Sequence, residues 1–338
     1  MKKLIGFLLT LTLILITPLQ SFALKKLGQT GLKFLDVGVG ARPAAMAEAY
    51  TVISDDANAI FHNPAGIAQM ECKTFDMTVS RTQWFADISY NAIGIAVNGG
   101  VWGNFGLSVI PAPDYGEIFG TVVSDNEQGF EETGAVEVSA YAFGLAYGRK
   151  FTDKFMIGAH VKYAYQHLGQ NPMMYRDPIT DSTWIGTQVN ELSTLAYDLG
   201  TIFYPGFKSF RFGMSIRNFS AAVVYEEYGF QLPLTFKIGI GMDILDLFGE
   251  HPGQSLLVAI DAVHPRDYTE RILLGGEYSI GLLKLRAGYK FNYSEEGLCA
   301  GVGIYAKGVK LDYAYNAFGA FAFGAFELVN RITLGVSF

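Results

Sequence analysis

The sequence predicts an all-β fold, a transmembrane antiparallel β-barrel of about fourteen strands with a short helical segment before the first strand. Three observations carry this prediction. Half of the 338 residues are apolar, yet only 17% are charged, against roughly 25% in soluble domains. The chain has 39 glycines, and beyond residue 23 its apolar side chains are dispersed rather than gathered in long runs. Along many segments apolar and polar residues alternate, which is the period of a β-strand.

The first 23 residues are typical of a secretory signal peptide. Lys2 and Lys3 precede an apolar run over residues 4–16, and the small residues Ser21 and Ala23 follow it. We expect cleavage after Ala23. The run is too short for a membrane-spanning helix, which needs about 20 residues. The residue directly after the cleavage site is Leu24 rather than a cysteine, which argues against a lipidated N-terminus. The formal net charge of -7, or -9 without the two lysines, argues against a basic nucleic-acid surface.

Residues 24–73 carry helix-start chemistry rather than alternation. The candidate starts are Pro43 in the first turn of one helix, Ser54 or Asp55 as the cap of a second, and Asn63 followed by Pro64 for a third. A proline is tolerated in the first turn because its missing N–H costs little there. A short polar side chain caps a helix by accepting a hydrogen bond from a free backbone N–H. The first two helices would end at Tyr50 and Phe61.

The strands are predicted from alternation. The C-terminal strand shows it most clearly, because one face carries Ile332, Leu334, Val336 and Phe338. Such segments run for roughly 8 to 15 residues, which suits the 9 to 11 tilted residues that cross a bilayer. The alternative is a soluble all-β fold, whose strands would usually be about 5 or 6 residues long. The fourteen candidate strands cover residues 74–80, 85–97, 101–111, 137–149, 154–168, 193–204, 208–219, 232–245, 254–264, 269–280, 282–292, 297–306, 308–317 and 327–338.

The predicted connections alternate between long and short. Outer-membrane barrels pair short periplasmic turns with longer external loops, and the predicted external loops include residues 112–136 and 169–192. Residues 246–253, DLFGEHPG, form one longer turn on the short side. Because lipid cannot satisfy an open sheet edge, the first strand should pair with the last. The predicted division is a signal peptide over residues 1–23, a plug over 24–73 and a barrel over 74–338.

One stretch carries a specific resemblance. Residues 34–69, FLDVGVGARPAAMAEAYTVISDDANAIFHNPAGIAQ, resemble the N-terminal region of the PorV/PorQ family, within the larger class of FadL-like outer-membrane transport proteins. The resemblance implies that this stretch folds as a plug inside a fourteen-stranded barrel. The alternative is that residues 24–73 hang in the periplasm. The shared mark of the family is the element formed by Asn63, Pro64, Ala65 and Gly66.

Two features depart from the family pattern. Ala47 and Glu48 stand where the resemblance implies two glycines, and His62 stands where an aromatic residue is usual. Both departures concern how the plug packs inside the barrel.

A polar barrel interior predicts an ionic interface between plug and wall. The charged residues expected on the plug are Arg42, Glu48, Asp55 and Asp56. The expected basic residues of the luminal wall are Lys237, Arg271, Lys284, Arg286, Lys290 and Arg331. Fewer acids share that face, among them Asp198, Asp261, Glu277 and Asp312. One interpretation is a basic wall that holds an acidic plug, and the other is that luminal charges pair with wall neighbours and water.

No motif points to an enzyme, a cofactor or a metal site. In GVGARP the third glycine of a nucleotide-binding loop would fall at Pro43. The five histidines show no metal-ligand spacing, and no serine, histidine and acid stand out as a catalytic set. Cys72 and Cys299 allow at most one disulfide. Six acids without a base in residues 112–136 indicate either a site for divalent ions that bridge surface lipid or a solvated loop.

The resemblance implies two functions. The first is passage of small hydrophobic molecules across the outer membrane of a Gram-negative-type bacterium, and an apolar pocket between plug and wall would favour it. The second is a role in type IX secretion, in which the barrel binds secreted cargo, and large external loops would favour it. A purely structural barrel is a third possibility. The expected partners are membrane lipid and the insertion machinery, which would read an assembly signal formed by Ile332, Leu334, Val336 and Phe338.

Overall fold

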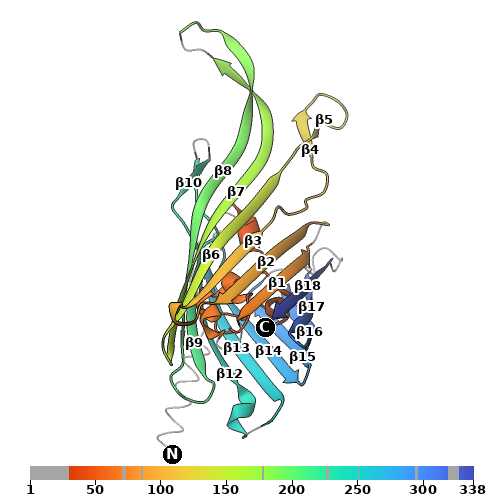
Figure 1. Cartoon of the computed structure of the whole chain (residues 1–338). Coiled ribbons are helices and arrows are strands. Elements are labelled where there is room, and N and C mark those ends of the chain that lie inside the picture. The colour runs from red at the N-terminus through yellow and green to blue at the C-terminus, as the bar shows by residue number, and fades with distance from the viewer. Residues whose placement is uncertain are drawn as a thin grey trace, which may run out of the picture.

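The computed structural model describes residues 30–70, 74–84, 87–176, 179–225, 228–249, 251–293, 296–318 and 327–338. The expected signal peptide and Cys72 lie outside these residues. Within them, fourteen antiparallel strands form a closed barrel (Figure 1). The predicted fold class is confirmed.

Each predicted strand corresponds to one strand of the barrel. The barrel strands are β1 (Phe75–Gln83), β2 (Ser89–Asn98), β3 (Asn104–Ile110), β6 (Ser139–Thr152), β7 (Phe155–Arg176), β8 (Thr183–Phe203), β9 (Arg211–Phe219), β12 (Thr235–Asp243), β13 (Gln254–Pro265), β14 (Arg271–Ile280), β15 (Leu283–Phe291), β16 (Glu296–Ala306), β17 (Val309–Phe318) and β18 (Glu327–Ser337). β1 pairs with β18 from Asp76 opposite Ser337 to Gln83 opposite Asn330. The first and last strands therefore close the barrel as predicted.

The two faces of the barrel differ as the alternation predicts. Large apolar side chains point outward, and Leu145 and Leu298, for example, are 69% and 58% exposed. Polar side chains such as Thr78 and Ser80 point inward and are buried. An apolar exterior around a polar interior is the pattern of a barrel that sits in lipid. Among the described residues, no helix has the length and apolar character needed to cross a membrane.

β7 and β8 extend far beyond the barrel and stand above the other strands in Figure 1. The prediction of a loop over residues 169–192 is wrong, because the two strands stay paired up to Arg176 opposite Thr183. Gly169 was read as a loop residue. It has a φ of +89° and lies where the register shifts, between His167 and Gln170. A bulge therefore absorbs the glycine, and the ladder continues.

Two smaller hairpins lie in other long connections. β4 (Phe119–Val123) pairs with β5 (Phe130–Ala135) within the predicted loop 112–136, and β10 (Val223–Tyr225) pairs with β11 (Tyr228–Phe230) between β9 and β12. We call the end of the barrel that carries these hairpins the long-loop end. The opposite, short-turn end carries the β2–β3 turn with η3 (Gly100–Trp102) and the β12–β13 turn with η4 (Ile244–Leu247).

The described residues before the first strand, 30–70, are called the N-terminal segment below. Its helices are η1 (Lys33–Asp36), α2 (Ala41–Ala45), α3 (Ala59–His62) and η2 (Pro64–Gln69), and they lie within the ring of strands in Figure 1. α2 contacts β16 and β17, and η2 contacts β6, β7 and β8. The segment starts at the long-loop end, where Thr30 bridges Gln231. It ends at the short-turn end, where Asn98 donates to the Met70 carbonyl at 3.0 Å.

The helix starts agree only in part with the prediction. Asn63 caps η2 as predicted, because its Oδ1 accepts from the N–H of Ala65 at 3.1 Å and Pro64 follows it as the first helical residue. Pro43 lies in the first turn of α2, but that helix stops at Ala45, well before Tyr50.

The predicted cap of the middle helix is wrong. The N-cap of α3 is Asn58 rather than Ser54 or Asp55, and its side chain makes no cap hydrogen bond. Asp56 and the wall share this role, because Asp56 Oδ1 accepts from the N–H of Asn58 at 3.0 Å and Asp76 of β1 accepts from the N–H of Ala57 at 2.9 Å. The bond from the distant strand leaves no local signal in the sequence.

Backbone strain follows α2. Ala47 and Glu48 have φ angles of +54° and +62°, in the left-handed region that favours glycine. These are the two positions at which the resemblance implies glycines. A side chain in this conformation costs about 1–2 kcal/mol. At Glu48 this cost is offset by an ion pair with Lys290 at 3.1 Å.

Candidate functional site at the interface between the N-terminal segment and the barrel wall

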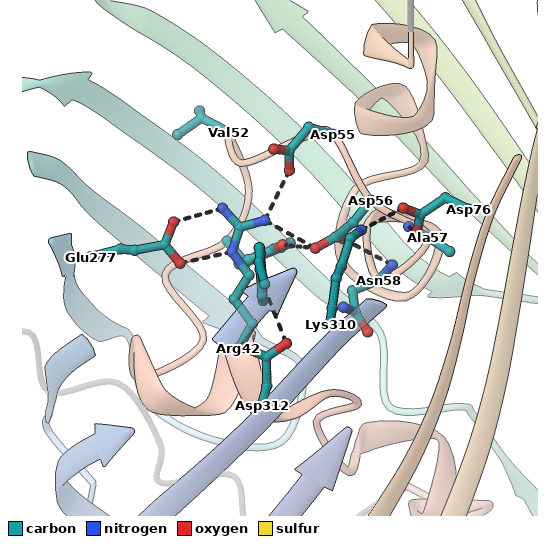
Figure 2. Close-up of polar contacts among 12 residues, drawn as sticks. Arg42, Val52, Asp55, Asp56, Ala57, Asn58, Asp76, Glu277, Lys310 and Asp312 are labelled. Carbon is teal, nitrogen blue, oxygen red and sulfur yellow. Dashed lines mark hydrogen bonds and ion pairs between the residues drawn. The ribbon is translucent and has the colours of Figure 1, made fainter. Parts of the chain in front are cut away.

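Arg42 of α2 is the centre of a buried ionic interface, and only 6% of it is exposed. Its Nε and Nη2 atoms donate to the two carboxylate oxygens of Glu277 on β14, at 2.9 and 2.8 Å. Its Nη1 atom donates to Asp55 and Asp56 at 2.8 and 3.0 Å, as Figure 2 shows. Two parallel bonds to one carboxylate are the strongest arrangement available to arginine. One guanidinium thus joins two parts of the N-terminal segment to the wall.

The ionic network continues through neighbouring strands of the wall. Arg286 of β15 also donates to Glu277, and it donates to Asp312 of β17 at 2.6 Å. Lys310 of β17 pairs with Asp76 of β1, close to Arg42 in Figure 2. Buried charges are costly unless each has a partner. Substitution of any one member by an uncharged residue should therefore be destabilising, because it leaves a buried charge with fewer partners.

Glu48, the strained residue after α2, lies among three cations of the wall. Its Oε1 atom is 3.1 Å from Lys290 Nζ and 4.0 Å from Arg331 Nη2, and its carbonyl accepts from Lys237 Nζ at 3.3 Å. Burial alone would raise the pKa of Glu48, but Lys290 and Lys237 outweigh burial and lower the pKa overall. Glu48 is therefore ionised at neutral pH and is attracted to this part of the wall.

β13 holds the next turn of the segment through a single carboxylate. Asp261 Oδ2 accepts from the backbone N–H groups of Tyr50 and Thr51, both at 3.0 Å, and from the Thr51 hydroxyl at 2.6 Å. These backbone groups have left the strand and helix ladders, so they need partners when buried. A wall side chain supplies one for both.

The element Asn63, Pro64, Ala65 and Gly66, on which the resemblance rests, is completely buried and packs against wall glycines. Asn63 Nδ2 donates to the Thr51 carbonyl at 2.6 Å and to the Thr201 carbonyl of β8 at 3.2 Å. A Cβ atom at Gly200 would lie 1.7 Å from Asn63 Oδ1, and one at Gly158 would lie 2.3 Å from Ala65 N. The close approach of the segment to β7 and β8 therefore requires glycine in both strands.

Four of the six predicted wall cations take part in the interface with the N-terminal segment. Lys237, Lys290 and Arg331 surround Glu48, and Arg286 joins the Arg42 network through Glu277. Two of the expected wall acids, Glu277 and Asp261, also contact the segment, and Glu277 pairs with its wall neighbour Arg286 as well, so features of both interpretations occur together. Asp76 was missed altogether. The polar positions Asp76, Thr78, Ser80 and Thr82 alternate along β1, and that signal could have found it.

The other two predicted cations stay on the wall. Arg271 lies over two rings, with its guanidinium carbon 4.3 Å from the ring centre of Tyr268 and 3.9 Å from that of Tyr293. Lys284 Nζ is 5.7 Å from the ring centre of Tyr305. Neither cation bonds to the described part of the N-terminal segment.

A serine, a histidine and an aspartate meet on the inner wall at hydrogen-bonding distances. Ser108 Oγ is 2.7 Å from His160 Nε2, and His160 Nδ1 is 3.0 Å from Asp198 Oδ2. These distances resemble those of a catalytic triad. However, each of the three residues is at most 3% exposed, and Lys162 and the N–H of Asn218 bind the other oxygen of Asp198, at 2.8 and 2.7 Å. In this structure the group joins β3, β7, β8 and β9 and has no access for a substrate.

In the part of the chain that the structure describes, no group of three or more His, Cys, Asp or Glu side chains is arranged so that it could hold a metal ion. Cys299 is buried beside Asn316, whose Nδ2 is 2.8 Å from its Sγ. Since Cys72 lies outside the described residues, the structure does not test whether it pairs with Cys299.

A small pocket lies between the N-terminal segment and the wall near the long-loop end, and apolar residues line it together with the polar Ser80, Thr82 and Asn91. Its lining includes Phe34, Val37, Val39, Tyr90, Ala92 and Ile110. The space inside is about 10 Å³, which is enough for roughly one water molecule. This pocket is therefore too small for a hydrocarbon molecule.

The four residues of the predicted assembly signal are exposed, three of them on β18 and Phe338 directly after it. Ile332, Leu334, Val336 and Phe338 are 53%, 51%, 37% and 71% exposed. Phe338 also takes part in barrel closure, because its carbonyl accepts from the backbone N–H groups of Thr74 and Phe75 at 2.8 Å. Its ring stacks on that of Phe75 at 5.1 Å between centres.

Comparison with known proteins gives likeness in fold but not in sequence. No protein-family model matches the chain. No curated protein sequence matches it either. Solved structures do match. The Ralstonia pickettii toluene transporter TbuX aligns with a TM-score of 0.58 and 12% identity, over 89% of this chain and 98% of that one.

Two further structures give the same result. The monoaromatic hydrocarbon channel CymD aligns with a TM-score of 0.58 and 12% identity, over 89% of this chain and 98% of that one. The Pseudomonas putida toluene transporter TodX aligns with a TM-score of 0.53 and 12% identity, over 94% and 98%. At this identity the likeness concerns the fold alone. The chain has the FadL-like barrel fold that its sequence predicted, and the PorV/PorQ part of the resemblance stays a prediction.

Proposed function

We propose that this chain is an outer-membrane barrel through which small hydrophobic molecules pass, and that residues 24–73 act as its plug. The fold it shares with toluene transporters supports this proposal, and so do the apolar side chains that face outward around the barrel. One observation carries it. The N-terminal segment fills the interior without becoming part of the strand ladder.

The segment is held by side chains rather than by strand pairing. Among the described residues its one β-bridge joins Thr30 to Gln231, which lies outside the barrel strands. The segment can therefore move at the cost of contacts such as that between Arg42 and Glu277, while each barrel strand keeps both neighbours. The backbone hydrogen bonds between the strands stay intact during such a movement, so no unpaired backbone group is exposed to lipid.

The chemistry of the long-loop half of the interior supports an apolar passenger. There Leu32, Phe34 and Leu35 of the segment form one buried apolar cluster with wall residues such as Ile110 and Ala142. A molecule that enters from this end meets the apolar cluster and the pocket beside Phe34 before it reaches the ionic interface. Because this pocket holds only about one water molecule, passage along it requires the segment to shift.

A second function fits a different observation. The β4–β5 and β7–β8 hairpins project from the long-loop end and expose apolar side chains, among them Val123 at 90% and Trp184 at 52%. Exposed apolar patches often mark protein–protein contacts. A PorV-like role in type IX secretion, in which these hairpins bind secreted cargo, is therefore the alternative. Both functions assume export, insertion by the outer-membrane machinery and residence in the outer membrane.

A looser plug tests the transport proposal. Asn63→Ala removes the cap of η2, which costs about 0.5–2 kcal/mol, and also removes the bond to the Thr51 carbonyl. The barrel should stay folded, while a fluorescent fatty acid and a fluorescent aromatic hydrocarbon should enter liposomes that contain the variant faster than liposomes that contain the parent. Asn126→Ala, in the exposed β4–β5 turn, is the matched control and should behave as the parent does.

The same experiment separates the alternatives. If protease cuts the N-terminal segment of Asn63→Ala faster but uptake is unchanged, the segment does not control passage through the barrel. The result would then favour the cargo-binding function or a purely structural role. If the whole barrel loses its heat resistance, the segment belongs to the folding core and is not a plug.

A further inference from the structure

A surface cup of about 580 Å³ lies between two turns at the short-turn end. The β8–β9 turn contributes Lys208, and the β12–β13 turn contributes Leu245, Asp246, His251, Pro252 and Gln254. The second turn is the long exception that the sequence showed on the short side. Turn residues rather than luminal residues line the cup, so the cup has no role in the proposed passage through the barrel. Its volume is in the range of small-molecule sites.

One hydrogen bond joins the two turns, and two more shape the β12–β13 turn. Asp243 starts η4, because its Oδ1 accepts from the N–H groups of Leu245 and Leu256, each at 3.0 Å. The N–H of Asp243 donates to the hydroxyl of Ser209 at 2.9 Å. Ser209 follows Lys208 directly, so this bond fixes the β8–β9 turn beside η4.

The cup presents both signs of charge. Among the described residues, the side chains of Lys208, Asp246 and His251 have no hydrogen bond or ion pair with another residue. Lys208 and His251 are exposed, and Asp246 is half-buried. Their charges and donors are therefore available to a ligand. A ligand with one negative and one positive group would satisfy both Lys208 and Asp246.

The surroundings of the cup are apolar. Phe207 and Phe248, which flank the cup residues in the sequence, are 58% and 74% exposed. Trp102 on the β2–β3 turn and Phe151 beside the β6–β7 turn are 75% and 59% exposed. Aromatic side chains at the end of a membrane barrel lie at the level of the lipid head groups. A cup at this level lies within reach of lipid head groups.

We propose that the cup binds the head group of a zwitterionic phospholipid in the inner leaflet of the outer membrane. Lys208 and the His251 ring donate to the phosphate, Asp246 accepts from the ammonium group, and the acyl chains lie along Phe207 and Phe248. The proposal shares with the proposed function only the placement of the barrel in a membrane. It does not depend on transport or on movement of the plug.

Native mass spectrometry of the delipidated full-length protein in detergent tests the proposal. Phosphatidylethanolamine should bind with a stoichiometry of one above the non-specific background. Lys208→Ala and Asp246→Asn should each weaken this binding about fivefold, as expected for one partly exposed charge. Asp246→Asn should in addition lose the preference for phosphatidylethanolamine over the anionic phosphatidylglycerol. Lys307→Ala, on the β16–β17 turn, is the matched control and should bind as the parent does.

Three results would overturn the proposal. The first is binding that all four proteins share, since this would be non-specific lipid association. The second is displacement of the lipid by millimolar inorganic phosphate, since the cup would then be a site for a free anion. The third is the absence of a bound lipid on the parent. Heat resistance of each variant on gels checks folding, and uptake in liposomes is measured separately, so a failure here leaves the transport proposal untouched.

Discussion

At the scale of single residues, Arg42 is the point at which the N-terminal segment depends most on the wall. Arg42→Ala leaves Glu277 and Asp56 buried without their main partner, which costs about 3–5 kcal/mol. Arg42→Lys keeps the charge but cannot form two parallel bonds with Glu277, so its effect should be smaller. Limited proteolysis should cut residues 30–70 fastest in the alanine variant and at an intermediate rate in the lysine variant.

The barrel itself should be spared, because Arg42 is not part of the ladder. The heat resistance of both variants on gels should stay near that of the parent. Arg176→Ala is a suitable control, since the pair that Arg176 forms with Asp181 is 70% and 73% exposed and such pairs contribute little. Equal proteolysis of all variants would show that another contact holds the segment.

His62 makes the segment sensitive to pH. Its Nε2 atom donates to the Val39 carbonyl at 2.9 Å, and burial, together with Arg217 and Lys237, lowers the pKa of His62 from 6.5 to about 3. A released segment would bind a proton near pH 6.5, so between pH 6.5 and about 3 the released form holds more protons and acidification favours release. Stabilisation by neutral His62 is therefore complete above pH 6.5 and is lost below it.

The expected effect is an increase in the rate of proteolysis of residues 30–70 as the pH falls from 7.5 to 5, equivalent to about 2 kcal/mol at most. His62→Phe restores an aromatic ring, which can pack against Tyr50 as the imidazole does at 5.2 Å between centres. This variant should lose most of the pH dependence. If its rate changes with pH as steeply as that of the parent, another group is responsible.

The sequence predicted the members of the interface better than their partners. Arg42 and Glu48 were expected to carry charge into the interior, and the cap at Asn63 followed from the residues themselves. The contact of Arg42 with Glu277, however, depends on the height of each wall residue within the barrel. That height follows from strand register and tilt, which alternation does not define. The same reason explains why Asp76 was missed as the partner of Ala57.

At the scale of elements, the strands could be predicted because alternation and length are both local. The error at β7 and β8 has a local cause as well. Gly169 has a φ of +89° and would end a regular strand, but a bulge needs only one such residue. The two hairpins within the long connections escaped because β4 and β5 are short and largely exposed. A strand without a buried face has little alternation to reveal it.

The topology of the connections gives a direct test. Asp125, in the β4–β5 turn, and Leu247, in η4, lie at opposite ends of the barrel. In a background with Cys72→Ser and Cys299→Ala, a membrane-impermeant maleimide should label Asp125→Cys on intact cells. It should label Leu247→Cys only after the outer membrane is permeabilised. Leu247 is chosen over Gly249, whose φ of +115° would strain a cysteine. The reverse labelling result would show that all fourteen strands cross the membrane in the opposite orientation to the one predicted.

At the scale of the whole molecule, closure of the barrel depends on both ends of the chain's strand region. Pairing of β1 with β18 means that no spanning edge is left open, which a membrane requires. The last residue is part of this seam. The Phe338 carbonyl accepts two backbone hydrogen bonds, and its own N–H donates to the Phe75 carbonyl at 3.0 Å. Its ring is 71% exposed, so the ring and the backbone of Phe338 have separable roles.

Two variants of the last residue distinguish assembly from stability. Phe338→Ala keeps the backbone bonds of the seam and removes the ring, whereas deletion of Phe338 removes both. If the ring is an assembly signal, both variants should reach the heat-resistant form more slowly in pulse-chase experiments. The assembled Phe338→Ala barrel should be as heat-resistant as the parent, because an exposed ring adds little to the folded state. Phe219→Ala removes an outward-facing ring that is 56% exposed and should insert at the parental rate. If Phe338→Ala also inserts at that rate while the deletion is slow, the backbone seam limits assembly and the terminal ring carries no signal.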